Sequence, residues 1–407
     1  MQLDEKMIAQ AKAVQEDMVR VRREIHRTAE TGLETFKTAE IITRELMRIG
    51  IPREDIRPMI NGAAVTAMIY GKSHGKCIGL RADCDALPIR EMADVPFKAE
   101  NGNMHACGHD THVAVVLGAA KLLYDNRQDL CCDVKLIFQP GEEVSAGAQL
   151  MIDEGVLEDP KVDCIVSFHS AVPGDSTPEF PCGSIGYFEN MPVSACVGKF
   201  KVVFKGKSTH GGMSPHLGVD PVYMAASAVL QLQAIMTREK EPTERAVLSI
   251  CRISAGNSFN IVPSEAEIAG TVRTFDKGLG EWILQRIREI CTSVAEGLRG
   301  TAEFPEMEIG SAVTVDPAMM KQLHESAAKI VGEDHIYKAV KPMFAGEDFA
   351  SFTDILPAAH FNHSVAFDDG TPMYPNHNDR FIVNEEKFYT GAATAARFIL
   401  DWAEKIS

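Results

Sequence analysis

Between residues 64 and 168, short apolar runs alternate with stretches of helical pattern, and this alternation constrains the fold more than any other feature. The apolar runs lie at 64–70, 77–81, 134–138 and 162–168, and the helical stretches lie at 112–124 and 146–154. Runs of this length are typical of strands buried on both faces of a sheet. Strands that alternate with helices favour an α/β fold. The sequence therefore predicts an α/β domain with a central sheet.

The segment before this alternation has the pattern of an amphipathic helix. Apolar residues recur there every three or four positions, at Met7, Ala11, Val14, Met18, Val21 and Ile25. Such spacing places them on one face of a helix, which the core would cover. We expect helices over roughly residues 5–60.

The pattern changes near residue 193. Strands are predicted at 199–205, 246–253, 266–274 and 301–309, helices between them at 220–238 and 281–298, and further helices at 317–331 and 385–407. Strand, helix, two strands, helix, strand is the ferredoxin-like order. The sequence thus predicts an α/β domain formed by residues 1–192 and 311–407, interrupted by a ferredoxin-like α+β domain at 193–310.

Charge and hydropathy exclude several classes of partner. The chain has 41 Lys and Arg against 57 Asp and Glu, a net charge of −16, so we expect neither nucleic-acid nor anionic-membrane binding. No apolar stretch approaches the roughly 18 residues of a transmembrane helix. Residues 1–30 are charged throughout and contain no secretory signal pattern. The ten cysteines form no CxxC pair, so we expect reduced thiols and a cytoplasmic location.

Chemically versatile side chains follow the predicted strands and recur in a loop near the C-terminus. They are Asp83 and Asp85, Cys107 and His109, Glu142 and Glu143, His169, and His377. Ligands of open α/β sheets bind outside the carboxyl ends of the strands. Taken singly, His169 suits a structural histidine, the glutamate pair suits a solvated turn, and Cys107 suits a buried thiol. Their joint occurrence favours a site for divalent ions, because thiolate, imidazole and carboxylate are metal ligands.

Motifs of other enzyme classes are absent from the sequence. There is no GxxxxGK(S/T) phosphate loop, no GxGxxG after a strand and no GxSxG nucleophile motif. The sequence therefore does not favour a nucleotide-binding enzyme or a serine hydrolase.

A series of ordered motifs resembles one family over roughly residues 15 to 400. The motifs are LRADCDALP at 80–88, MHACGHD at 104–110, FQPGEE at 138–143, HGGMSPH at 210–216, GTVRTF at 270–275, GEDF at 346–349, and His377. They are similar to those of the aminoacylase/carboxypeptidase metallohydrolases, in the amidohydrolase branch that contains hippurate, aminobenzoyl-glutamate and indole-acetyl-amino-acid hydrolases. The resemblance implies a catalytic α/β domain interrupted by a ferredoxin-like lid and dimerisation domain, and a homodimer.

The resemblance also implies roles for individual residues. The implied ligands of two divalent ions per chain, Mn, Zn, Co or Ni, are Cys107, His109, Glu143, His169 and His377. Glu142 matches the general base, and Asp85 matches an acid that orients a metal ligand. His210 matches a donor to the oxyanion, reaching the site of the other subunit. The implied substrate-binding residues are Arg273 for a free carboxylate, together with Asn260, His216 and Glu347. Asp83 and Asp110 are candidates for orienting ligands.

These implications predict a metal-dependent hydrolase that cleaves the amide bond of small N-acyl amino acids. One alternative is a dipeptidase or carboxypeptidase on the same two-metal site, whose substrates carry a free amine on the acyl side. Another is a small-molecule binding protein without turnover. The chain departs from the usual motifs at Val144–Gly147, Ser170 and Asn376, which bear on the acyl group that fits.

Overall fold

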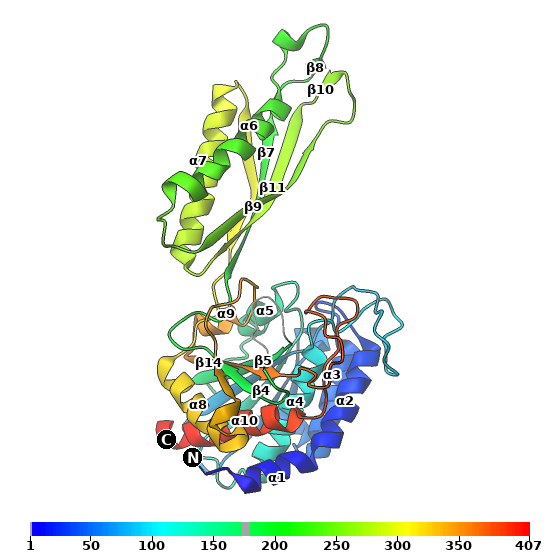
Figure 1. Cartoon of the computed structure of the whole chain (residues 1–407), viewed down its shortest axis with the longest axis vertical. Coiled ribbons are helices and arrows are strands. Elements are labelled where there is room, and N and C mark those ends of the chain that lie inside the picture. The colour runs from blue at the N-terminus through cyan, green and yellow to red at the C-terminus, as the bar shows by residue number, and fades with distance from the viewer. Residues whose placement is uncertain (1, 173–179) are drawn as a thin grey trace. The chain divides into compact units, whose positions relative to one another are not determined.

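The computed structural model describes residues 2–172 and 180–407, and the chain forms two compact units (Figure 1). The larger unit comprises Met1–Val193, Val313–Pro342 and Glu347–Ser407, and the smaller unit comprises Ser194–Ala312 and Met343–Gly346. The predicted α/β architecture with an inserted unit is confirmed. The return of residues 343–346 to the smaller unit is a feature that the sequence pattern does not indicate.

The larger unit is built on a mixed sheet of eight strands among the described residues, in the order β1-β2-β4-β3-β5-β14-β6-β13. The strands are β1 (Ile56–Met59), β2 (Ala64–Ile69), β3 (Cys77–Asp83), β4 (Asp133–Gln139), β5 (Cys164–Ala171), β6 (Ile185–Tyr187), β13 (Ile336–Lys338) and β14 (Ala358–Ser364). β3 pairs in parallel with β4 and β5, and β5 pairs in parallel with β14. Every residue of β3 and β4 is buried, which requires cover on both faces of the sheet.

Helices supply this cover. They are α1 (Glu5–Ala13), α2 (Gln15–Thr28), α3 (Phe36–Ile49), α4 (His109–Asp125), α5 (Gly147–Asp153), α8 (Pro317–Val331), α9 (Ala350–Thr353) and α10 (Phe388–Ile406), with short 3₁₀ turns η1 (Arg53–Asp55), η2 (Ile60–Gly62) and η5 (Glu333–His335). α4 is buried over most of its length and packs against α2 and α10. Of the predicted apolar face, Met18, Val21 and Ile25 are buried on α2. No helix of the described residues is long and apolar enough to span a membrane.

Four strands of this sheet, β1, β6, β13 and β14, lie outside the residue ranges predicted as strands. Ile56–Met59 lies in the region expected to be helical but forms β1, antiparallel to β2. Ala358–Ser364 forms β14 inside the sheet, although no strand was predicted there. Its sequence AAHFNHS contains two histidines and an asparagine, all of them buried. These polar residues interrupt the continuous apolar run by which an interior strand is predicted.

The smaller unit is a four-stranded antiparallel sheet, in the order β12-β7-β11-β9, packed against two helices. Its elements are β7 (Cys196–Lys205), α6 (Pro221–Ala234), the π turn η4 (Ile235–Glu239), β9 (Ala246–Ala255), β11 (Glu265–Thr274), α7 (Lys277–Gly297) and β12 (Thr301–Ile309), with η3 (Pro215–Leu217) and a separate pair formed by β8 (Thr209–His210) and β10 (Ile261–Val262). This is the predicted ferredoxin-like order. Side chains cap both helices, since Asp220 accepts from Val222 N and Asp276 accepts from Leu279 N. The returning segment joins the unit where Ala195 N donates to Ala345 O at 2.9 Å.

Candidate metal and catalytic site

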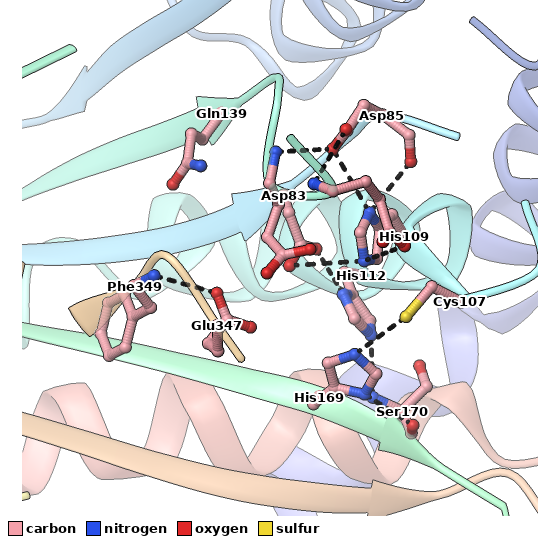
Figure 2. Close-up of polar contacts among 12 residues, drawn as sticks. Asp83, Asp85, Cys107, His109, His112, Gln139, His169, Ser170, Glu347 and Phe349 are labelled. Atoms are coloured by element: carbon pink, nitrogen blue, oxygen red, sulfur yellow. Dashed lines mark hydrogen bonds and ion pairs between the residues drawn. The ribbon is translucent and has the colours of Figure 1, made fainter. Parts of the chain in front are cut away.

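Polar side chains gather at the carboxyl ends of β3, β4 and β5, which are neighbours in the sheet (Figure 2). Asp83 is the last residue of β3, Gln139 is the last residue of β4, and His169 lies in β5. His109 is the first residue of α4, which starts earlier than predicted because Gly108 turns the chain with φ of +90°. The structure therefore brings these segments to one edge of the sheet.

Cys107, His109 and His169 form the first group of potential metal ligands. Cys107 Sγ lies 3.5 Å from His169 Nε2. His169 Nδ1 donates to the Ser170 carbonyl at 2.8 Å, and His109 Nδ1 donates to the Asp85 carbonyl at 2.9 Å. When either ring loses its Nε2 proton, the Nδ1 proton stays in this bond, so Nε2 offers a lone pair to a metal ion. The ligand atoms of the three side chains lie within 4.8 Å of one another.

A second group shares Cys107 and adds Glu143 and His377. Its ligand atoms also lie within 4.8 Å of one another, and His377 Nε2 is 3.4 Å from Glu143 Oε1. His377 has φ of +67°, and its N–H donates to the Ala106 carbonyl at 2.8 Å. This bond ties the C-terminal loop to the turn that carries Cys107.

Asp85 fixes the turn that carries both glutamates. Its buried carboxylate accepts from Glu142 N at 3.1 Å and from Glu143 N at 3.2 Å. The preceding Gly141 has φ of +69°, a conformation that favours glycine. Asp85 thus positions the peptide between Glu142 and Glu143, while its own carbonyl orients His109.

Glu142 lies in a group of three carboxylates. Ligand oxygens of Glu142, Glu347 and Asp348 lie within 4.8 Å of one another, and Asp348 N donates to Glu142 Oε1 at 3.4 Å. The Arg81 guanidinium, fully buried, bonds to Asp348 at 2.9 Å and lies 3.1 Å from Glu347. Glu347, predicted to bind substrate, therefore lies beside the predicted general base.

These contacts shift the acidities of the carboxyl groups. Burial, together with the charges of Glu347 and Asp348, raises the pKa of Glu142 well above its usual value. Burial raises the pKa of Asp348 to about 7, although Arg81 acts in the opposite direction. A carboxyl group with a raised pKa exchanges protons effectively near neutral pH.

The thiol shifts in the other direction. Burial alone would raise the pKa of Cys107, but the positive charges of His109 and His169 hold it well below its usual value. At His169, burial acts to lower the pKa of the ring, but the Cys107 thiolate raises it to about 9. The metal-free cluster therefore carries a thiolate, which is the form that binds metal ions.

Asp83 and His112 form a buried pair behind the ligands. His112 Nδ1 donates to Asp83 Oδ1 at 2.5 Å, and His112 Nε2 accepts from Ser170 N at 2.8 Å. Asp83 also accepts from Arg81 at 2.8 Å. The sequence analysis did not single out His112, Arg81 or Asp348, although the motifs contain Arg81 and Asp348, and His112 lies one helical turn after His109.

Asp110 contacts Arg22 and His26 rather than the potential metal ligands. It lies 2.7 Å from Arg22 Nε and 2.8 Å from His26 Nδ1, and His26 Nε2 lies 3.1 Å from Glu91. All four side chains are buried. Asp110 therefore anchors the first turn of α4 to α2.

The remaining predicted residues lie in the smaller unit. His210, Asn260 and His216 are exposed, and Arg273 is half-buried on β11. His210 Nδ1 accepts from Gly212 N at 3.2 Å and from Met213 N at 3.0 Å, so a neutral ring carries its proton on Nε2. The residues labelled in Figure 2 all belong to the larger unit.

Arg273 and Asn260 make local contacts. The Arg273 guanidinium donates to Thr271 Oγ1 and, at 3.1 Å, to the Val272 carbonyl. Among residues 2–172 and 180–407, the Arg273 guanidinium forms no ion pair and makes only these local hydrogen bonds. Asn260 Oδ1 accepts from Ser258 Oγ at 2.7 Å, and its carbonyl accepts from Gly211 N at 2.9 Å.

The donor set fits a divalent metal ion. Among the described residues, His109 Nε2 and Glu143 Oε1 are buried side-chain atoms without a hydrogen-bond partner. Such an atom costs about 1–3 kcal/mol unless something binds it. Thiolate, imidazole and carboxylate together suit Zn, Co, Ni or Mn.

An α/β unit with a ferredoxin-like insertion, and a carboxylate beside a cluster of metal-ligand side chains, is the arrangement of a metallohydrolase. The chain belongs to peptidase family M20/M25/M40, whose sequence model matches residues 79–401. The family resemblance of the motifs is thereby confirmed, and the chain is a hydrolase of the peptidase and amidohydrolase type.

Similar proteins include enzymes with different names. The chain is 35% identical over 347 residues to an N-acetylcysteine deacetylase of Bacillus subtilis, covering 85% of this chain and 87% of that protein. It is 32% identical over 408 residues to thermostable carboxypeptidase 2 of Saccharolobus solfataricus, covering 100% of both. A solved Bacillus subtilis structure, described as a dinuclear metal-binding peptidase of the M20 family, has a TM-score of 0.81 at 31% identity, covering 97% of this chain and 99% of that chain.

Proposed function

We propose that the protein hydrolyses the amide bond of small N-acyl amino acids, releasing a carboxylic acid and a free amino acid. One observation carries the proposal: the Glu142 carboxylate lies beside a set of thiolate, imidazole and carboxylate donors in a chain of this family. The proposed ligands of two divalent ions per chain are Cys107, His109, Glu143, His169 and His377. The deacetylase relative and the dinuclear neighbour support this assignment.

Glu142 is the proposed general base. When bound, the two ions would polarise the amide carbonyl and lower the pKa of water. Glu142 takes a proton from the attacking water on a carboxylate oxygen and returns it to the leaving nitrogen. Its raised pKa suits both steps, because the group must accept and then release a proton near neutral pH. Glu143 remains available as a ligand, since Asp85 holds the two glutamates in separate positions.

Two residues of the smaller unit complete the proposed reaction. The Nε2–H of His210 is a free donor in the neutral ring, and we infer that it stabilises the oxyanion, in the site of the other subunit of a homodimer. One such donor is worth about 10²–10³ in rate. Arg273 is proposed to bind the substrate carboxylate, because its guanidinium forms no ion pair among the described residues. His216, Asn260 and Glu347 remain candidates for substrate contacts.

A carboxypeptidase or dipeptidase activity on the same site is the second candidate. The full-length similarity to a thermostable carboxypeptidase favours it. The two activities share all the residues above and differ in the acyl side of the substrate, which carries a free amine in a dipeptide.

A substrate panel separates the two activities. Amino-acid release is measured from N-acetyl, N-benzoyl and N-aminobenzoyl amino acids and from dipeptides, after chelation and again after addition of Mn, Zn, Co or Ni. We expect metal-restored release from N-acyl amino acids. Release from dipeptides alone would favour the second candidate, and silence across the panel with metal bound would favour a binding protein.

The general base is tested by Glu142→Gln. We expect kcat to fall by about 10²–10⁴ while substrate still binds, because glutamine keeps the size of the side chain but cannot take a proton. Glu158→Gln is the matched control, since Glu158 is an exposed glutamate of the same unit. Wild-type turnover by the Glu142→Gln protein would contradict the assignment.

A further inference from the structure

Asn376 lies against the shared ligand of both groups of metal donors. Its side-chain Nδ2 is 3.5 Å from Cys107 Sγ and 3.2 Å from the Cys107 carbonyl oxygen. Both of these atoms are acceptors, so only the NH₂ end of the amide satisfies both contacts. Nδ2 thus lies within hydrogen-bond distance of two acceptors of the same residue. The orientation of the amide is thereby fixed by its surroundings.

The other nitrogens beside Cys107 Sγ belong to proposed ligands. His109, His169 and His377 each interact with the thiolate in the metal-free chain. In His109 and His169, Nδ1 donates its proton to a backbone carbonyl. In the neutral ring, Nε2 therefore has a lone pair that would bind an ion. Asn376 is different, because an amide N–H cannot become a metal ligand and remains a donor when ions are bound.

Asn376 also holds the turn that presents His377. His377 lies in the left-handed region with φ of +67°, which is uncommon for a residue other than glycine. The turn is tied to the Cys107 segment by His377 N donating to Ala106 O at 2.8 Å and by the Asn376 amide. One side chain thus contacts the sulfur of one proposed ligand and precedes another in the chain.

We propose that Asn376 is a positioning residue of the metal site, whose amide donates to the Cys107 thiolate and so sets the strength of the bond between that sulfur and a divalent ion. This inference rests on the proposed metal site. A hydrogen bond to a thiolate draws electron density from sulfur, and groups that hydrogen-bond to ligands typically change metal affinity by about 10–100-fold. The sequence motifs mark position 376 as a departure from the family pattern, where His or Leu is common, and neither side chain repeats this pair of bonds.

Cobalt(II) provides the test, because its bond to a thiolate gives a sulfur-to-cobalt charge-transfer band in the near ultraviolet. Metal-free wild type and Asn376→Leu and Asn376→Ala proteins are titrated with Co(II) while the band is recorded. We expect both variants to bind Co(II) about 10-fold more weakly, because the turn that presents His377 loses its amide bond to the Cys107 carbonyl. We also expect the band at longer wavelength at saturation. The shift arises because a sulfur that has lost its donor gives up an electron more easily.

Asn378→Leu is the matched control, since it makes the same exchange two residues along the same loop. Asn378 Oδ1 accepts from Arg380 N, and within the described chain its side chain forms no hydrogen bond to a proposed ligand. We expect the wild-type band and affinity from this variant. A purely steric role of Asn376 would give different band positions for the Leu and Ala variants, which would contradict the proposal.

The outcomes separate the role of Asn376 from the proposed metal site. A wild-type band that neither variant shifts, with unchanged Co(II) affinity, overturns the role of Asn376 and leaves the metal site standing. A wild-type protein that binds Co(II) without any sulfur-to-cobalt band removes Cys107 from the ligand set and overturns both.

Discussion

The two units bury different kinds of side chain. The buried residues of the larger unit include Arg22, Arg81, Asp83, Asp110 and Asp348, all of them paired with opposite charges. In the smaller unit, which the structure describes throughout, the buried polar residues are Ser194 and Thr274 and no charged side chain is buried. Buried charges are costly unless they are paired and hydrogen-bonded. The larger unit bears this cost at the strand ends where the proposed chemistry lies.

Exposure shows the same contrast. β3 and β4 are buried throughout, whereas β7 alternates between buried and partly exposed positions and the edge strand β9 has no buried residue. The interior strands of the larger sheet are thus enclosed on both faces, whereas the smaller sheet leaves a face and an edge accessible. The difference predicts that similar substitutions have unlike effects in the two units.

The largest difference between the two units is expected when a buried cysteine is replaced in each of them. Cys107→Ala should lower activity by at least about 100-fold and reduce bound metal, because it removes the ligand shared by both donor groups. Cys291→Ala, in the buried core of α7, is the matched control and should leave metal content unchanged. Elemental analysis and kinetics check both variants. Wild-type metal content in the Cys107→Ala protein would remove Cys107 from the proposed ligands.

Arginine should show the next largest difference. Arg81→Met leaves Asp83 and Asp348 buried without their cation, which costs about 3–5 kcal/mol of unfolding free energy. Arg252→Met in the smaller unit removes a pair between the exposed Arg252 and the half-buried Glu267 and should cost less than about 1 kcal/mol. Denaturant unfolding of the metal-free proteins measures both. Equal costs would mean that burial does not distinguish the two sites.

Histidine adds a dependence on pH. Burial and Arg22 lower the pKa of His26, but hydrogen bonds to Asp110 and Glu91 more than offset them, so the pKa is raised above 6.5. The stabilisation is complete below the unfolded-state value and is lost as pH rises through the raised folded-state value. His26→Asn should therefore cost about 2 kcal/mol at pH 6 and less at pH 9. His216→Asn, an exposed control of the smaller unit, should change stability little at either pH. A cost independent of pH would exclude a charged His26.

The smallest change in stability is expected at the edge strand. Ile253 on β9 is 56% exposed, so Ile253→Lys should alter the unfolding free energy by less than about 0.5 kcal/mol. If the proposed homodimer forms through this edge, the same substitution shifts the sedimenting species to monomer. A dimer that persists would place the interface elsewhere, and a monomeric wild type would contradict the proposed dimer.

The sequence predicted those parts of the fold that follow local patterns. The interior strands β3, β4 and β5 and the order of the smaller unit were predicted, because apolar runs and alternation are visible within a few residues. β14 was missed because its His360, Asn362 and His363 are polar although the strand is buried. β1 was missed because only its two end residues, Ile56 and Met59, are buried.

The candidate site shows the same limit. Motifs indicated Glu142, Glu143 and the histidines, since each motif is continuous in sequence. The contact of Arg81 with Asp348 joins residues 267 positions apart, and no local pattern encodes it. The bond from Asn376 to Cys107 spans 269 positions, so sequence analysis marked Asn376 as unusual without a reason.

The orientation of His109 and His169 has a genetic consequence. Both rings donate from Nδ1 to a backbone carbonyl, that of Asp85 for His109 and that of Ser170 for His169. A point mutation can replace any side chain but leaves the carbonyl of that position in place. Substitution of Asp85 or Ser170 therefore leaves in place the carbonyl that sets the tautomer of each ring. His112 has no such protection on its Nδ1 side, because a single codon change at Asp83 would remove that partner and leave only the bond from Ser170 N.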